Sequence, residues 1–176
     1  MITKSLLSYL IVISSLLVYS CTEPNPNRNT YSEKVLKQNE VGEQMPLNHE
    51  YIDSVYVPVY SDIYSRSKKT HFLLTVTLSI RNTSYTDTLI IRTIDYFNTQ
   101  GDLVKEYLDE PIYLNPMASI DYVIDEKDDS GGSGANFIVV WSAKNAKVNP
   151  IIQAVMISTN GQQGVAFTTE GVSILK

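Results

Sequence analysis

Residues 71–82 alternate between apolar and polar side chains, and this pattern constrains the fold more than any other feature of the sequence. One face of the segment carries four aliphatic side chains, whereas the other is mostly threonine and serine. A period of two indicates a β-strand with one buried face. We expect the core to contain this face and side chains of later strands: Leu74, Val76, Leu78, Ile80, Val139, Trp141, Val155 and Ile157.

Further short strands are predicted along the chain, separated by segments rich in turn-forming residues. They cover residues 54–60, 88–97, 103–107, 112–114, 119–124, 136–143, 151–159, 164–169 and 172–175. No long segment has the 3.6-residue period of an amphipathic helix, which disfavours α/β architectures. Many short strands at this spacing predict an all-β fold, an antiparallel immunoglobulin-like β-sandwich.

Two of these strands are placed more specifically by their residues. Pro58 has no backbone N–H to donate, so the strand at residues 54–60 is expected at a sheet edge. Residues 136–143 are apolar on both faces, as expected of a central strand. This strand carries Trp141, the only tryptophan, which is expected in the core between the sheets.

The first twenty residues are typical of a secretory signal peptide. Lys4 precedes a mostly apolar run over residues 6–18, which ends in small residues. A membrane-spanning helix is the alternative, but a span takes about 20 apolar residues and this run is shorter. The sequence LVYSC at residues 17–21 resembles a bacterial lipobox. We therefore expect Cys21 to be lipidated and to become the first residue of the mature chain, the alternative being a free cysteine in an ordinary signal peptide.

The expected lipid anchor sets the location and the first partner of the protein. Cys21 is the only cysteine, so the chain forms no internal disulfide and no cysteine-cluster zinc site. Two or three acyl chains on Cys21 hold a protein firmly to a lipid bilayer. Thr22 follows in place of the aspartate that retains some lipoproteins in an inner membrane. We expect a lipid-anchored protein of the bacterial cell envelope, on the outer membrane facing the periplasm.

Residues 21–50 are expected to form the lipidated N-terminus and a flexible linker. The stretch TEPNPNRNT at residues 22–30 has no side chain large and apolar enough to join a core. One short helix is predicted from about residue 32, limited by Gly42 and Pro46. The β-sandwich domain is then expected over residues 51–176. A net charge of −5 argues against a nucleic-acid partner.

Five stretches of the chain carry a resemblance to a known family: VYVPVYS at 55–61, LSIRNT at 78–83, IDYF at 94–97 with Gly101, DDSGGSGANF at 128–137 and PIIQAVMI at 150–157. Through them the chain, from about residue 55 to its end, resembles the DUF3124 family of small exported bacterial domains. The resemblance implies no activity. A strand ending in RNT and followed by IDYF is also similar to immunoglobulin-like domains of exported proteins, which agrees with the predicted sandwich by analogy.

The segment DEKDDSGGSG at residues 125–134 is the strongest candidate for a functional loop. Successive glycines allow backbone N–H groups to converge into a nest for an anion. The segment lacks the motifs of a phosphate-binding Walker loop, a nucleophile elbow and an EF-hand calcium loop. The alternative is a polar connector between strands. The possible binding residues are Asp128, Asp129, Ser130, Gly131, Gly132, Ser133, Gly134 and Asn136.

These features favour a membrane-anchored, non-catalytic binding or scaffolding domain over an enzyme. The expected partners are the bilayer and an unknown envelope protein or small ligand, with no cofactor and no metal. Neither histidine has a second ligand at metal-binding spacing. The alternative is an envelope enzyme that uses carboxylates such as Asp95, Asp128 or Asp129, with or without a metal. The tyrosines at 56, 60 and 64 are a second candidate surface, an aromatic strip for a glycan or a peptide, or else ordinary packing.

Overall fold

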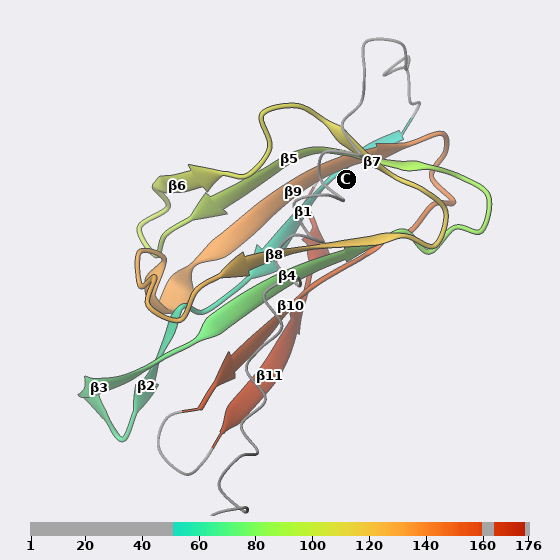
Figure 1. Cartoon of the computed structure of the whole chain (residues 1–176). Helices are drawn as coiled ribbons and strands as arrows, with labels where there is room; N and C mark the ends of the chain where they lie inside the picture. Colours follow the sequence, from blue (N-terminus) through green and yellow to red (C-terminus); the bar gives the residue numbers. More distant parts are fainter. Residues whose placement is uncertain (1–50, 160–163, 175–176) are drawn as a thin grey trace, which may run out of the picture. The chain divides into compact units, whose positions relative to one another are not determined.

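The computed structural model describes residues 51–159 and 164–174, which fold into two antiparallel sheets and a separate two-stranded hairpin (Figure 1). The strands are β1 (Tyr51–Pro58), β2 (Asp62–Ser65), β3 (Ser67–Leu73), β4 (Thr75–Arg81), β5 (Leu89–Phe97), β6 (Leu103–Glu106), β7 (Ile112–Leu114), β8 (Ser119–Ile124), β9 (Asn136–Ala143), β10 (Ile151–Ser158), β11 (Val165–Glu170) and β12 (Val172–Ser173). The described part contains one 3₁₀ turn, η1 (Gly132–Gly134), and no helix in it is long and apolar enough to cross a bilayer. The predicted signal peptide, lipidated Cys21, linker and short helix lie outside the described residues.

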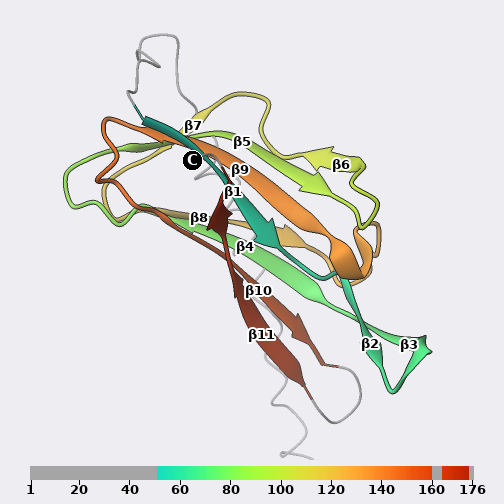
Figure 2. The same cartoon turned by 180° about the vertical axis from the view of Figure 1, so that it is seen from behind.

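The two sheets face each other, as the views from the front and from behind both show (Figure 2). The first sheet has the order β12-β1-β9-β5-β6, with β7 also paired to β5, and the second has the order β11-β10-β4-β8. Every pairing is antiparallel. The predicted all-β antiparallel sandwich is therefore confirmed. The strand that carries Trp141, β9, lies between β1 and β5 as a central strand, as predicted.

The core lies between the sheets and confirms six of the eight side chains predicted for it. Leu74, Val76, Leu78, Ile80, Val139 and Trp141 are all at most 3% exposed. The prediction for β10 is wrong by one residue, since Ile157 is 46% exposed and Val155 is only half-buried.

The register of β10 against β4 explains this error. Ala154 lies opposite Leu78 and Met156 lies opposite Val76, so these two β10 residues share the buried face of β4. Residues 151–157, IIQAVMI, are apolar at both parities. Alternation alone therefore does not tell which face of this strand is buried.

The long alternating segment at residues 71–82 belongs to two strands and not to one. β3 ends at Leu73 and pairs with β2 in the hairpin, whereas β4 starts at Thr75 and joins the second sheet. Leu74, between them, is fully buried and donates its N–H to the carbonyl oxygen of Ser61 at 2.9 Å. The hairpin thus leaves the sandwich at a buried residue.

Pro58 is the last residue of β1, a strand predicted for a sheet edge. That prediction is wrong, because β1 lies between β9 and β12, although β12 pairs only with Val55 and Tyr56. Pro58 is therefore beyond the short ladder with β12, and its missing N–H costs no hydrogen bond on that side.

Gly171 is the point where the chain crosses from the second sheet to the first, between β11 and β12. Its N–H donates to the carbonyl oxygen of Ile152 at 2.8 Å. A Cβ atom here would lie 2.5 Å from a methyl carbon of Val55 and 2.7 Å from that carbonyl oxygen. Only glycine allows the two sheets to be joined so closely, and this crossing forms one wall of the pocket described below.

Candidate functional site

The glycine-rich loop between β8 and β9 has an exposed acidic half and a docked glycine half. Residues 125–130 are exposed, whereas Gly131 is buried. The acidic half is a turn in which the N–H of Asp128 donates to the carbonyl oxygen of Asp125 at 2.9 Å. The Asp128 carboxylate accepts hydrogen bonds from the backbone and the hydroxyl of Ser130.

The glycine half packs against the loops around Ser61 and Thr99. The N–H of Gly132 donates to the Ser61 hydroxyl at 2.8 Å, and the N–H of Gly134 donates to the Thr99 hydroxyl oxygen at 2.9 Å. These two N–H groups are used within the chain and do not converge into a free nest. Gly132 has a φ of +75°, in the left-handed region that favours glycine. Gly131 is buried because it packs on Tyr96, and Gly132 and Ser133 are half-buried.

The other candidate residues of the sequence are spread over the fold. Asn136 is half-buried at the start of β9, opposite Pro58 and Phe97. Asp129 is exposed in the loop, and Asp95 lies in β5 opposite Glu106. In residues 51–159 and 164–174, no three His, Cys, Asp or Glu side chains lie close enough together to hold a metal ion. The binding role of the loop stays a prediction.

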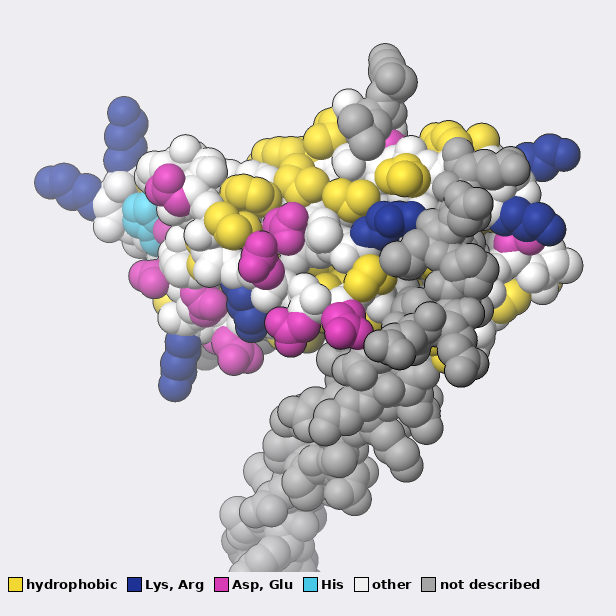
Figure 3. Space-filling model, turned by 90° about the horizontal axis from the view of Figure 1, so that it is seen from above, with side chains coloured by type: hydrophobic (Ala, Val, Ile, Leu, Met, Phe, Trp, Pro, Cys, Tyr) yellow, Lys and Arg dark blue, Asp and Glu magenta, His cyan; other side chains and the backbone are white. Residues whose placement is uncertain are grey.

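The β2–β3 hairpin collects basic residues and the one described histidine. Figure 3 shows the histidine at one end of the molecule beside basic side chains, and further basic side chains lie toward the opposite end of the same face. Nδ1 of His71 lies 3.1 Å from the carboxylate of Asp62, and its ring packs 4.5 Å from that of Tyr64. Tyr64 is 60% exposed, whereas the ring of Tyr60 packs on Phe167 at 5.8 Å. The candidate tyrosine strip is therefore divided between hairpin and core.

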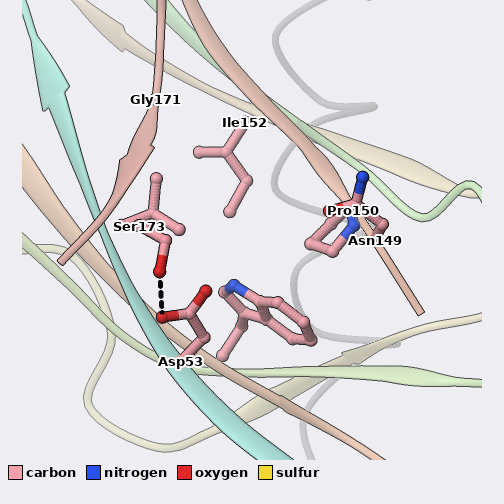
Figure 4. A pocket seen from close by; sticks show the side chains of 8 residues that line it. Asp53, Asn149, Pro150, Ile152, Gly171 and Ser173 are labelled. Atoms are coloured by element: carbon pink, nitrogen blue, oxygen red, sulfur yellow. Dashed lines mark hydrogen bonds between the residues drawn. The ribbon is translucent and has the colours of Figure 1, made fainter. Parts of the chain in front are cut away.

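A pocket at one edge of the sandwich, here called the Asp53 pocket, is lined by residues of both sheets. Its cavity has a volume of about 100 Å³. Asp53, Val55, Trp141 and Ser173 come from the first sheet, Ile152 from the second, and Asn149, Pro150 and Gly171 from the adjoining loops. Asn149 and Ser173 are exposed at the rim, whereas Asp53, Val55, Trp141 and Ile152 are buried. In Figure 4, Asp53 and Ser173 lie opposite Asn149 and Pro150 across the pocket.

Asp53 is the only charged residue that is buried in the part of the chain that the structure describes, with 5% of its surface exposed. Its Oδ1 accepts two hydrogen bonds of 2.8 Å, from the N–H of Ser54 and from the hydroxyl of Ser173. Across residues 51–159 and 164–174, no lysine or arginine forms an ion pair with it. A buried carboxylate without a cation is costly, which marks Asp53 as a candidate for a functional residue.

Trp141 lies directly opposite Asp53 in the pairing of β9 with β1. The side chain is 3% exposed, and its indole N–H has no hydrogen-bond partner. A buried donor without an acceptor costs about 1–3 kcal/mol. The pocket thus holds one buried negative charge and one unused N–H group side by side. The prediction that Trp141 belongs to the core is confirmed, and its second role at a pocket was not predicted.

Asp53 was missed because the strand was expected to start at Ser54, whereas β1 starts at Tyr51. One sequence signal does point to it. Asp53 lies on the same face of its strand as Val55, Val57 and Val59, and this face is buried. An acidic residue on the inward face of an alternating strand is rare enough to indicate a site.

Two facing antiparallel sheets with a polar pocket at one edge define this part of the chain as a small all-β sandwich domain. A family model matches residues 52–174, and the chain belongs to that family, described as protein of unknown function (DUF3124). The predicted resemblance is thereby confirmed. A search of curated proteins found no match. Among solved structures, the crystal structure of Thermotoga maritima 1070 is similar at 14% identity and a TM-score of 0.39, covering 72% of this chain and 96% of that one.

One residue of the stretches that resemble the family has a clear structural role. Asn82 follows β4 and is 2% exposed. Its side-chain nitrogen lies 2.8 Å from the carbonyl oxygen of Asp87 and 3.1 Å from those of Leu114 and Asn115. Its side-chain oxygen accepts the N–H of Ser84 at 3.0 Å. Asn82 therefore connects the loops before β5 and after β7.

Proposed function

We propose that this chain is a membrane-anchored lipoprotein of the bacterial cell envelope whose β-sandwich is a non-catalytic binding domain. The Asp53 pocket carries the binding half of this proposal, since it combines a buried unpaired carboxylate with a buried unused N–H. A buried charge without a counterion and a buried N–H without an acceptor are both costly for the fold, and an occupant of the pocket would compensate them. The anchor half is supported by the sequence LVYSC at residues 17–21, and an outer-membrane position facing the periplasm by Thr22.

The anchor is tested by the Cys21→Ser variant in a bacterial host. Wild type is expected in the membrane fraction and labelled by a fatty-acid analogue, because acyl chains on Cys21 hold it to the bilayer. Cys21→Ser is expected to lose the label and to leave the membrane or accumulate as uncleaved precursor. Thr22→Ser, which keeps the LVYSC sequence, is the matched control and should behave as wild type. Equal labelling of wild type and Cys21→Ser would refute the anchor.

The binding role is tested on the full-length chain with Trp141 as the probe. The chain has one tryptophan, so its indole N–H gives a single resonance in a nitrogen-15 correlation spectrum. A panel of chemical classes, namely small amines, sugars, carboxylates and divalent cations, is titrated while this resonance is followed. A saturable shift with the compound recovered unchanged supports a binding domain. Conversion of the compound would support the carboxylate- or metal-dependent enzyme instead, and no response to any class would overturn the binding role.

A further inference from the structure

The negative charge in the Asp53 pocket indicates which charge its ligand carries. Oδ1 of Asp53 is occupied by the N–H of Ser54 and the hydroxyl of Ser173, both neutral donors. Neutral donors orient a carboxylate but leave its charge unbalanced. A buried carboxylate is favourable when a cation with good hydrogen-bond geometry joins it. The missing counterpart is therefore a group that is both positively charged and a hydrogen-bond donor.

The indole of Trp141 adds a second and opposite requirement. Its buried N–H has no acceptor, so a ligand that reaches it needs a hydrogen-bond acceptor atom. Asp53 and Trp141 are direct neighbours across β1 and β9. The positive group and the acceptor therefore belong to one small molecule or one terminus, a few bonds apart.

The size of the pocket limits what enters it. A cavity of about 150 Å³ holds a six-carbon ring, so the volume here, about 100 Å³, suits a group of about four or five heavy atoms. Val55 and Ile152 provide apolar walls, which suit a short carbon link between the two polar ends. The exposed rim at Asn149 and Ser173 leaves a path for a longer ligand to continue outward.

We infer that the Asp53 pocket binds a primary ammonium group with an adjacent carbonyl oxygen, the ammonium on Asp53 and the oxygen on the indole N–H of Trp141. This inference rests on the proposed binding function and names the chemistry of its ligand. Two sources present that chemistry. One is a free amino-acid amide, and the other is the amino terminus of a peptide whose remaining residues lie outside the rim.

The experiment titrates the full-length chain, purified in detergent, with three compounds. Glycinamide carries the ammonium and the carbonyl, whereas glycolamide has the same heavy-atom count with a neutral hydroxyl in place of the ammonium. Triglycine amide presents the same terminus on a peptide. Glycinamide is expected to shift the Trp141 indole resonance saturably, with glycolamide at least about tenfold weaker because it brings no charge to Asp53. Tighter binding of triglycine amide than of glycinamide identifies a peptide terminus, and equal or weaker binding identifies the free amine.

Variants separate binding from folding. Asp53→Asn keeps the shape and an oxygen acceptor for Ser54 and Ser173 but removes the negative charge. Its affinity for glycinamide is therefore expected to fall at least about tenfold. Its melting temperature without ligand should be equal to or above that of wild type, because a buried unpaired charge is gone. Asp121→Asn, at an exposed position on β8, is the matched control and should bind as wild type. Trp141→Phe removes the N–H donor and should therefore weaken the binding of glycinamide, measured by calorimetry.

The inference is overturned if glycolamide binds as well as glycinamide, if Asp53→Asn binds glycinamide as wild type does, or if glycinamide gives no shift. These failures are distinguishable from failure of the binding function. A response to sugars, carboxylates or divalent cations alone would leave a binding domain with a different ligand. If no class of compound shifts the indole resonance, both the inferred ligand and the proposed binding function are overturned.

Discussion

The hydroxyl group of Tyr96 occupies the volume that a Cβ atom at Gly131 would need. Such a Cβ would overlap the phenolic oxygen, and would lie 2.6 Å from Cζ of the same ring and 2.8 Å from Cβ of Ala135. Gly131 is buried with a φ of −79°, so it is the close approach and not the backbone angle that requires glycine. The glycine content of the candidate loop is thus explained in part by packing on the first sheet.

Gly131→Ala is therefore expected to destabilise the fold by about 1–3 kcal/mol, the usual cost of overpacking. Chemical denaturation of the full-length chain measures this. Gly164→Ala is the control, because a Cβ atom at Gly164 would lie an ordinary 3.6 Å from the carbonyl oxygen of Ser158. Adding Tyr96→Phe to Gly131→Ala removes the overlapping hydroxyl and should recover part of the loss, a non-additive result. Equal stability of the two alanine variants would contradict the packing described here.

The stability of the fold is predicted to depend on the amide group of the Asn82 side chain. Asn82→Asp replaces a donor with a carboxylate that faces the carbonyl oxygens of Leu114 and Asn115, and it should cost about 2–4 kcal/mol at neutral pH. The loss should shrink in acid, where the carboxyl group is protonated and regains one donor. Asn145→Asp is the matched control, since Asn145 uses its oxygen to accept the N–H of Lys147 and a carboxylate does the same. The free energies of unfolding of both variants, compared at neutral and acidic pH, decide the point.

Sequence patterns were sufficient where one strand has one buried face or clear turn signals at both ends. The predicted bounds of β7, β8 and β9 agree with the structure residue for residue. Patterns failed in β10, where both faces of the strand carry apolar residues. They also failed at Leu74, where the alternation continues although the chain passes from the hairpin to the second sheet. The pairing of Asp53 with Trp141 joins distant parts of the chain and depends on strand register, which no local pattern gives.

The corrected register of β10 and β4 leads to a direct comparison of three truncations. Leu78→Ala and Met156→Ala remove fully buried side chains that lie in neighbouring rows of the core, and each should cost about 2–5 kcal/mol. Ile157→Ala removes a side chain that is 46% exposed and should cost about 1 kcal/mol or less. Thermal or urea unfolding distinguishes these outcomes. A larger loss for Ile157→Ala than for Met156→Ala would restore the register expected from the sequence.

The aromatic cluster beneath the loop predicts a loss of stability in alkali. Burial raises the pKa of Tyr107 from 10.0 to about 12, and the negative charges of Asp128 and Asp125 act in the same direction. Burial also raises the pKa of Tyr122. The rings of these two tyrosines pack at 5.3 Å. Since only the neutral phenol suits this cluster, ionisation opposes folding.

The sign of the pH dependence follows from the raised pKa of Tyr107. Between pH 10 and about 12 the folded state keeps a proton that the unfolded state has released, so the free energy of unfolding falls as the pH rises. The stabilisation is fully present below pH 10 and is lost through the folded pKa. Tyr107→Phe removes this titration, so its stability should decline less steeply over that range than that of wild type. Tyr85→Phe, at a position 84% exposed, is the control and should follow the wild-type slope. Urea unfolding at several alkaline pH values measures the slopes, and identical slopes for Tyr107→Phe and Tyr85→Phe would exclude Tyr107 as a source of the alkaline loss.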